Sequence, residues 1–89
     1  MKIKVRYIGK ANELFGLNEK EEFLYLPENA FYKDAIQALR EKFLAKNKDK
    51  VDFLNEVILL TKEGRILKNI ENEPISTDEI IVGYLIAGG

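Results

Sequence analysis

Apolar and charged residues alternate at the start of the chain. In residues 2–7, KIKVRY, every second residue is apolar and the residues between them are basic. This period of two predicts a half-buried strand. Residues 21–26, EEFLYL, predict a second strand that ends before Pro27 and pairs with the first as a hairpin. Between the two strands, residues 11–16, ANELFG, predict a short helical turn that Gly16 stops.

Residues 32–46, YKDAIQALREKFLAK, carry the only extended helical pattern of the chain. Asp34 suits the positive N-terminal end of this helix, and the basic residues of its last turns suit the negative end. Phe31 and Tyr32 stand where a capping side chain is preferred, so Asn29 is the nearest polar candidate for the cap. The helix is expected to pack on the strands through an apolar stripe at helical spacing, formed by Ala35, Ile36, Leu39 and Phe43.

The second half of the chain predicts a further hairpin and a final strand. The polar residues 47–56 favour a solvated loop. Residues 57–61, VILLT, and 65–67, RIL, flank Gly64, which can adopt the positive φ of a hairpin bend. Residues 79–85 are mostly apolar on both faces, which is typical of a strand at the centre of a sheet. The chain would therefore leave the sheet at one end and point away from the body.

Together these elements predict an α+β fold, a mixed sheet of four to five strands with one main helix packed across it. The 89 residues are enough for one domain with one modest core. We expect residues 1–85 to form this domain and residues 86–89 to form a flexible C-terminal tail.

The composition excludes several classes of chemistry. The chain has no cysteine and no histidine, so it lacks disulfides, thiolate metal ligands, a cysteine nucleophile and the commonest general base. Its 14 basic and 15 acidic residues are well mixed and form no basic stripe of the kind that binds nucleic acid. The apolar run at residues 80–89 is too short to span a bilayer. We therefore expect a cytoplasmic protein without a bound metal, a nucleic-acid partner or a membrane partner.

The sequence closes with two glycines, which cost more backbone entropy to order than any other residue. The pair predicts a thin, pliable tail, and a frayed terminus is the alternative. Before the glycines, Leu85 favours core packing over a partner pocket, Ile86 favours a partner contact, and Tyr84 is balanced between the two. The candidate tail and partner-binding residues are Tyr84, Leu85, Ile86, Ala87 and Gly88, and the candidate reactive residue is Gly89.

Several short motifs match a known family in their order and spacing. A Glu-Leu-x-Gly motif follows the first strand, Asp-Ala and Ala-Leu pairs lie in the helix, an Asp-Glu pair precedes the last apolar run, and Gly-Gly ends the chain. The matching residues are Glu13, Leu14, Phe15, Gly16, Asp34, Ala35, Ala38, Leu39, Asp78, Glu79, Gly88 and Gly89. Over nearly its whole length the chain resembles the MoaD/ThiS-type ubiquitin-like β-grasp sulfur carriers, most of all the small subunit of molybdopterin synthase.

This resemblance implies a carrier subunit that is not itself an enzyme and binds no cofactor. A MoeB-like adenylating enzyme of the ubiquitin-activating type would use ATP to join AMP to the carboxylate of Gly89. Sulfur transfer would then leave a C-terminal thiocarboxylate, which a MoaE-like large subunit of molybdopterin synthase would use to make molybdenum or tungsten cofactor. None of these steps needs a catalytic side chain on the carrier, in agreement with the absence of Cys and His.

Three alternatives stay open at the level of the sequence. A ubiquitin-like modifier would use the same adenylate but pass Gly89 to a substrate lysine. A carrier of the thiamine pathway would share the thiocarboxylate and differ in its acceptor. A β-grasp interaction domain would need no activation of its C-terminus.

Overall fold

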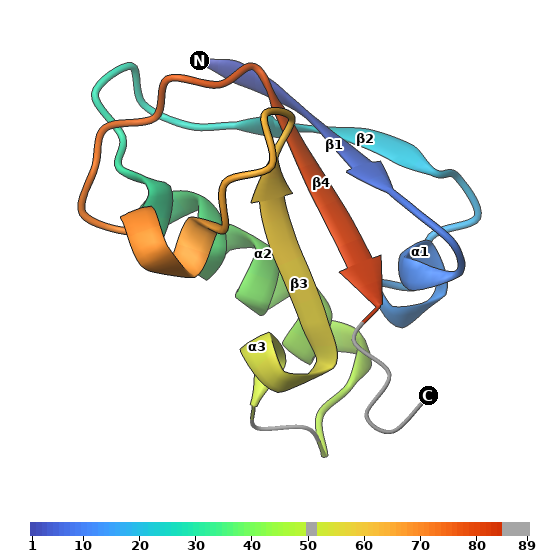
Figure 1. The fold of residues 1–89 in the computed structure, drawn as a ribbon. Coiled ribbons are helices and arrows are strands. Elements are labelled where there is room, and N and C mark those ends of the chain that lie inside the picture. The colour runs from blue at the N-terminus through green and yellow to red at the C-terminus, as the bar shows by residue number, and fades with distance from the viewer. Residues whose placement is uncertain (50–51, 85–89) are drawn as a thin grey trace.

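A four-stranded mixed sheet forms the body of the protein in a computed structural model that describes residues 1–49 and 52–84. The strands are β1 (Lys2–Tyr7), β2 (Glu21–Tyr25), β3 (Val57–Thr61) and β4 (Glu79–Tyr84). Their order across the sheet is β2-β1-β4-β3. β1 is antiparallel to β2 and parallel to β4, and β3 is antiparallel to β4. The prediction that the last strand is central is therefore confirmed (Figure 1).

The two faces of the sheet differ in their side chains, and we call them the inner and the outer face. Ile3, Val5 and Tyr7 of β1 point to the inner face and are buried, as their alternation with basic residues predicts. The helix α2 (Tyr32–Lys46) packs on this inner face (Figure 1). The predicted stripe of α2 is confirmed, because Ala35, Ile36, Leu39 and Phe43 are all buried.

The N-terminus of α2 is capped in a way that differs from the prediction. Its N-cap is Phe31, and the backbone N–H of Phe31 donates to the carboxylate of Asp34 at 2.8 Å. Asn29 was the wrong candidate, because an acidic side chain in the first turn reaches back to the cap backbone and makes a polar cap residue unnecessary.

The stretch predicted as a solvated loop contains a short helix, α3 (Phe53–Glu56), so that part of the prediction was wrong. Phe53 is 1% exposed and its ring centroid lies 5.1 Å from that of Phe43 and 6.1 Å from that of Phe15. A four-residue helix is too short to show a helical period, and a single aromatic residue among charged ones carries little signal. α1 (Ala11–Leu14), by contrast, lies where the sequence predicts it.

The predicted hairpin after β3 is only partly present. Gly64 has the expected positive φ of 92° at the bend. Beyond it, one isolated bridge joins Leu60 to Ile66, and the chain then turns into the 3-10 helix η1 (Leu67–Ile70). Residues 65–67 therefore form no strand, and the described part of the chain has four strands in its sheet. This turn of the chain buries Leu67 and Ile70 in the core.

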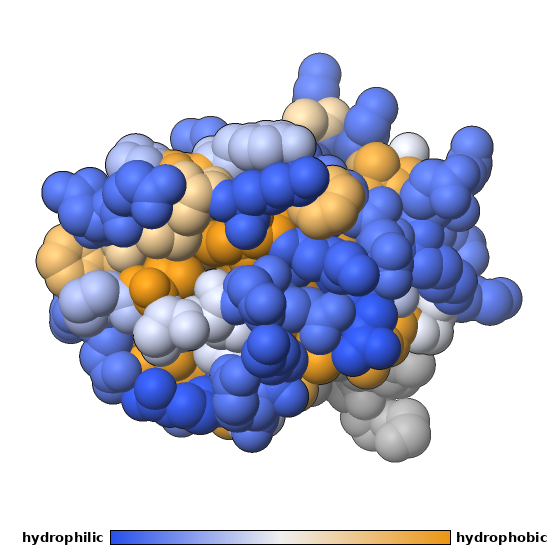
Figure 2. All heavy atoms as spheres, turned by 90° about the horizontal axis from the view of Figure 1, so that it is seen from above, coloured by the Kyte–Doolittle hydropathy of each residue, from blue (hydrophilic) through white to orange (hydrophobic). Residues whose placement is uncertain are grey.

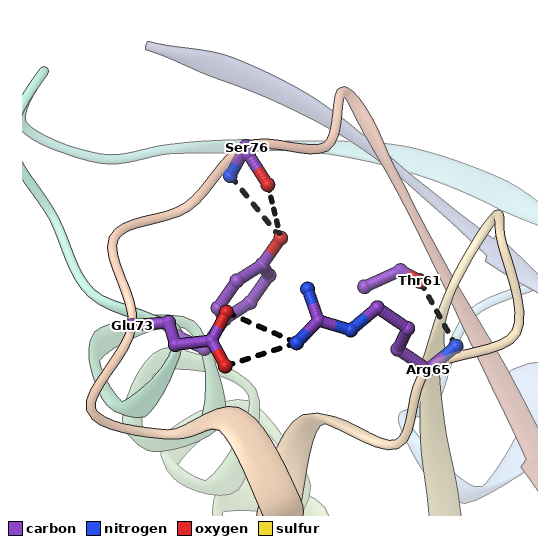
Figure 3. Close-up of polar contacts among 5 residues, drawn as sticks. Thr61, Arg65, Glu73 and Ser76 are labelled. Carbon is purple, nitrogen blue, oxygen red and sulfur yellow. Dashed lines mark hydrogen bonds and ion pairs between the residues drawn. The ribbon is translucent and has the colours of Figure 1, made fainter.

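The connection from η1 to β4 is fastened to the body by polar contacts (Figure 3). The backbone N–H of Ser76 donates to the hydroxyl of Tyr32 at 3.1 Å, and the guanidinium of Arg65 contacts both carboxylate oxygens of Glu73 at 2.9 and 3.0 Å. Arg65 is itself held before η1, because its N–H donates to the hydroxyl of Thr61, the last residue of β3, at 3.1 Å. These contacts fix where β4 begins, and hence the line along which it carries the C-terminal residues.

Candidate functional site

The end of β4 is where the chain approaches the residues predicted to be functional. β4 lies between β1 and β3 and runs toward the end of the molecule opposite the N-terminus (Figure 1). Tyr84 is its last residue. The other predicted site residues lie outside the described residues, as does the predicted flexible tail 86–89; they are Leu85, Ile86, Ala87, Gly88 and Gly89.

Tyr84 is available for contact with another molecule. It pairs with Val57 of β3 through the backbone, and its side chain is 44% exposed. The sequence left its role balanced between the core and a partner. In the structure nearly half of the surface of this residue is exposed, at the last position of β4.

An apolar area covers the outer face of the sheet next to this exit. Five side chains form it around Gly83, which is buried between them, and we call the six residues the exit platform. Ile8 and Ile66 are 48% and 40% exposed, and the other three side chains are half-buried. The members of the exit platform are Ile8, Ile58, Leu60, Ile66, Ile81 and Gly83. Contiguous exposed apolar areas are where soluble proteins bind partners, so the exit platform is a candidate docking surface.

The centre of the exit platform depends on glycine. A Cβ built on Gly83 would lie 3.1 Å from Cγ2 of Ile58 and 3.4 Å from Cδ1 of Ile8. The two isoleucine side chains therefore converge over the strand, where a side chain at position 83 would hold them apart. Sequence reasoning missed these residues, because it explained apolar residues on both faces of the central strands by burial alone.

A shallow hollow extends the exit platform around the edge of β3. It has a volume of about 160 Å³ and is lined mostly by apolar side chains. Ile58 and Ile66 belong to both the hollow and the exit platform. A partner with a flat apolar surface and one projecting side chain would fit this combination.

The opposite end of the sheet is polar. The ammonium group of Lys62 lies 2.7 Å from the carboxylate of Asp78, an ion pair that raises the pKa of Lys62 and lowers the pKa of Asp78. Asp78 directly precedes β4, so this pair lies at the start of that strand and far from its exit. Seen from this end, most of the surface is hydrophilic, with smaller hydrophobic areas between the charged residues (Figure 2).

A third group with a shifted pKa, the hydroxyl of Tyr7, lies in the core. Burial, and next the hydrogen bond to Glu22, raise the pKa of the Tyr7 hydroxyl. Glu22 also pairs with Lys42 at 2.8 Å, so the three side chains join β1, β2 and α2. This arrangement keeps the tyrosine neutral and ties the helix to the sheet.

Two further kinds of feature were sought in the part of the chain that the structure describes, a metal-binding cluster and a membrane-spanning helix. Within residues 1–49 and 52–84, no three acidic side chains come together in a way that could hold a metal ion. Among the same residues, no helix has both the length and the apolar character needed to cross a bilayer.

Solved structures with the same fold are found over nearly the whole chain, although no family model matches it and no curated protein matches its sequence. A protein described as molybdopterin converting factor subunit 1 from Pyrococcus furiosus is 28% identical, with 93% of each chain covered and a TM-score of 0.64. SAMP1 from Haloferax volcanii is 16% identical, with both chains fully covered and a TM-score of 0.68. The Haloferax volcanii HVO 2177 protein is 18% identical, with a TM-score of 0.63. The match covers the whole of the present chain and 87% of the HVO 2177 chain.

These likenesses agree with the motifs in the sequence. The mixed sheet with a helix across one face matches the fold of all three neighbours. The resemblance expected from the motifs is thereby confirmed by structure: the chain has the ubiquitin-like β-grasp fold and is similar to molybdopterin converting factor subunit 1 and to SAMP1.

Proposed function

We propose that the chain is a sulfur carrier of molybdopterin biosynthesis that acts in the cytoplasm through the carboxylate of Gly89. The observation that carries the proposal is the course of β4, which is central in the sheet and leads the chain out beside the exit platform. The 28% identity to molybdopterin converting factor subunit 1, over 93% of both chains, supports this choice of pathway. Residues 1–85 serve as the body of the carrier, and residues 86–89 serve as its reactive tail.

The chemistry requires activation of an unreactive group. A terminal carboxylate has a pKa near 3.5, so it is ionised at neutral pH and is a poor electrophile. One carboxylate oxygen of Gly89 attacks the α-phosphorus of ATP on the partner enzyme, and pyrophosphate leaves. Hydrosulfide then attacks the acyl carbon of the adenylate, and AMP leaves. The product is a thiocarboxylate in which sulfur replaces one oxygen.

The exit platform serves in this proposal as the docking surface for the adenylating enzyme and for the large subunit of the synthase. The five residues after Tyr84 would reach about 17 Å when fully extended. That is enough to place a carboxylate in the active site of a partner that sits on the exit platform. Glycines at the last two positions let the tail pass through a narrow channel.

A ubiquitin-like protein modifier is the second candidate. It is favoured by the similarity to SAMP1, a ubiquitin-like small archaeal modifier protein, which covers both chains completely. The same adenylate would form, but the ε-amine of a substrate lysine would finally attack the acyl carbon. The product would be an isopeptide in place of a thiocarboxylate.

Intact mass spectrometry distinguishes the two candidates. The purified protein is incubated with its adenylating enzyme, ATP and sodium sulfide, and a parallel sample contains a lysate of the native cell. Replacement of one oxygen by sulfur on the free protein supports the carrier. Lysine-linked adducts without any thiocarboxylate would support the modifier, and an unchanged mass in both samples would contradict both.

The exit platform gives a prediction of its own. Ile8→Asp is expected to weaken binding of the adenylating enzyme by about tenfold or more, because it places a charge in the apolar contact. The free energy of unfolding should change by less than about 1 kcal/mol, since the side chain is 48% exposed. Isothermal titration calorimetry and urea unfolding provide the two measurements.

Phe31→Asp is the matched control for this prediction. Phe31 is a large apolar residue, 39% exposed, at the N-terminus of α2 and outside the exit platform. The Phe31→Asp variant should bind the adenylating enzyme as tightly as the native protein does. Equal binding by the Ile8 variant and the native protein would show that the exit platform is not the docking surface.

A further inference from the structure

One edge of the sheet has backbone groups that face no other strand. Leu26 donates to the carbonyl of Met1 at 2.9 Å, and Tyr7 donates to the carbonyl of Lys20 at 2.7 Å. The backbone N–H and C=O groups of successive residues in a strand point to opposite sides. In residues 20–26, those of the even-numbered residues therefore point toward β1. The N–H and C=O groups of Glu21, Phe23 and Tyr25 therefore point away from the sheet.

The other edge of the sheet is covered. Thr61 of β3 donates to the carbonyl of Arg65 at 2.8 Å, and Val57 donates to the carbonyl of Phe53. The bridge between Leu60 and Ile66 closes more of this edge. Within the described residues, no segment lies along β2 in the same way. An open edge of this kind is a template for another strand.

The side chains beside the open edge are suited to a second strand. Phe23 and Tyr25 lie on the outer face and are 45% and 70% exposed. The ammonium group of Lys2 lies 4.2 Å from the centroid of the Phe23 ring and holds one side of the ring. No proline interrupts β2. The edge therefore offers donors, acceptors and apolar surface together.

We infer that β2 pairs antiparallel with β2 of a second copy of this chain, around a two-fold axis at Phe23. In this register Phe23 faces Phe23 of the other copy, and Glu21 faces Tyr25. Glu21, Phe23 and Tyr25, whose backbone groups point away from β1, then all have a partner residue in the other copy, and each pair of residues exchanges two hydrogen bonds. Shifting the register by two residues loses one of these pairs, so the strand is most complementary to itself at this position.

The charges of β2 agree with pairing between two copies. Glu21 lies 4.0 Å from Lys4, and Glu22 lies 2.8 Å from Lys42, so each carboxylate already has a cation in its own copy. In the proposed register no two carboxylates lie directly opposite, which avoids the repulsion of like charges across a sheet. The two aromatic rings at the axis add a favourable cross-strand pair.

This interface is separate from the proposed function. β2 lies at one edge of the sheet, and β1 separates it from β4. The dimer would leave both exit platforms and both C-terminal ends open to partners. Pairing along one short strand buries little area, so we expect weak association that depends on concentration.

Cysteine cross-linking tests the register directly, because the native chain has no cysteine. Opposite residues of a hydrogen-bonded antiparallel pair have their Cα atoms about 5.5 Å apart, within the range of a disulfide. With oxidised glutathione as the oxidant, Phe23→Cys should form a disulfide dimer at least about tenfold faster than Tyr84→Cys. Tyr84 is the matched control, since it is an aromatic residue exposed to 44% on a central strand.

A mixture of two variants tests the pairing of Glu21 with Tyr25. Glu21→Cys and Tyr25→Cys together should give the mixed disulfide several times faster than either gives its own dimer.

Sedimentation equilibrium of the native protein up to about 1 mM should show a dimer, and Phe23→Lys should lower the association constant by about tenfold or more. A native protein that stays monomeric, or equal cross-linking at positions 23 and 84, would overturn the inference.

Discussion

Deleting Gly89, or adding one residue after it, is expected to lower ATP-dependent activation by more than about 100-fold. The reason is geometric. Activation requires the carboxylate at a fixed reach from the docked body, and a misplacement of about 1 Å can cost on the order of 100-fold in rate. Folding should be unaffected, because neither change touches the described core, which lies within residues 3–82.

The measurement is exchange of radiolabelled pyrophosphate into ATP, with the purified adenylating enzyme and each variant at the same concentration. Lys48→Ala is the control, since Lys48 is an exposed residue in the segment after α2 and is not a member of the exit platform. It should be activated as fast as the native protein. Equal activation of the extended variant would refute both the carrier and the modifier, and the interaction-domain alternative would then be favoured.

Much of the fold could be predicted because the pattern of its residues reflects burial. β1 alternates apolar and basic residues since only its inner face meets the core. α2 shows a stripe because one side of it packs on the sheet. β4 is apolar on its inner face because Ile80 and Val82 meet the core, and on its outer face because Ile81 belongs to the exit platform. In these elements the local pattern and the tertiary environment agree, so the sequence alone was sufficient.

The exit platform could not be predicted, because an apolar residue on a strand has two explanations. Ile58 and Ile81 have the same character as the core residues beside them, yet they lie on the outer face and are only half-buried. Gly83 gives no sign in the sequence that two isoleucines converge over it. Only the strand order, which brings residue 8 beside residues 58 and 83, shows that these side chains form one surface.

The prediction of a solvated loop after α2 was wrong for a different reason. Residues 47–56 are mostly polar, and the polar majority hides one anchor. Phe53 reaches the ring of Phe43 in the preceding helix and the ring of Phe15, which comes from much earlier in the chain. A contact of this kind depends on how the chain returns to the core, which no local period records.

The last prediction follows from that anchor. Phe53→Ala is expected to lower the free energy of unfolding by about 3 to 5 kcal/mol, since it removes a fully buried ring and leaves a cavity. The lost ring also contacts Phe43 at a centroid distance of 5.1 Å, an aromatic pair worth about 0.5 to 1.5 kcal/mol. Urea unfolding followed by circular dichroism measures the change.

Asn55→Ala provides the control within the same short helix. Asn55 is exposed, so its substitution should change the free energy of unfolding by less than about 0.5 kcal/mol. If residues 47–56 were a solvated loop, both substitutions would be nearly neutral. A loss at position 53 alone, with none at position 55, therefore separates an anchored α3 from a loop. Because α3 leads directly into β3, we also expect the Phe53 variant to lose protection of the β3 amides against hydrogen exchange before those of β1.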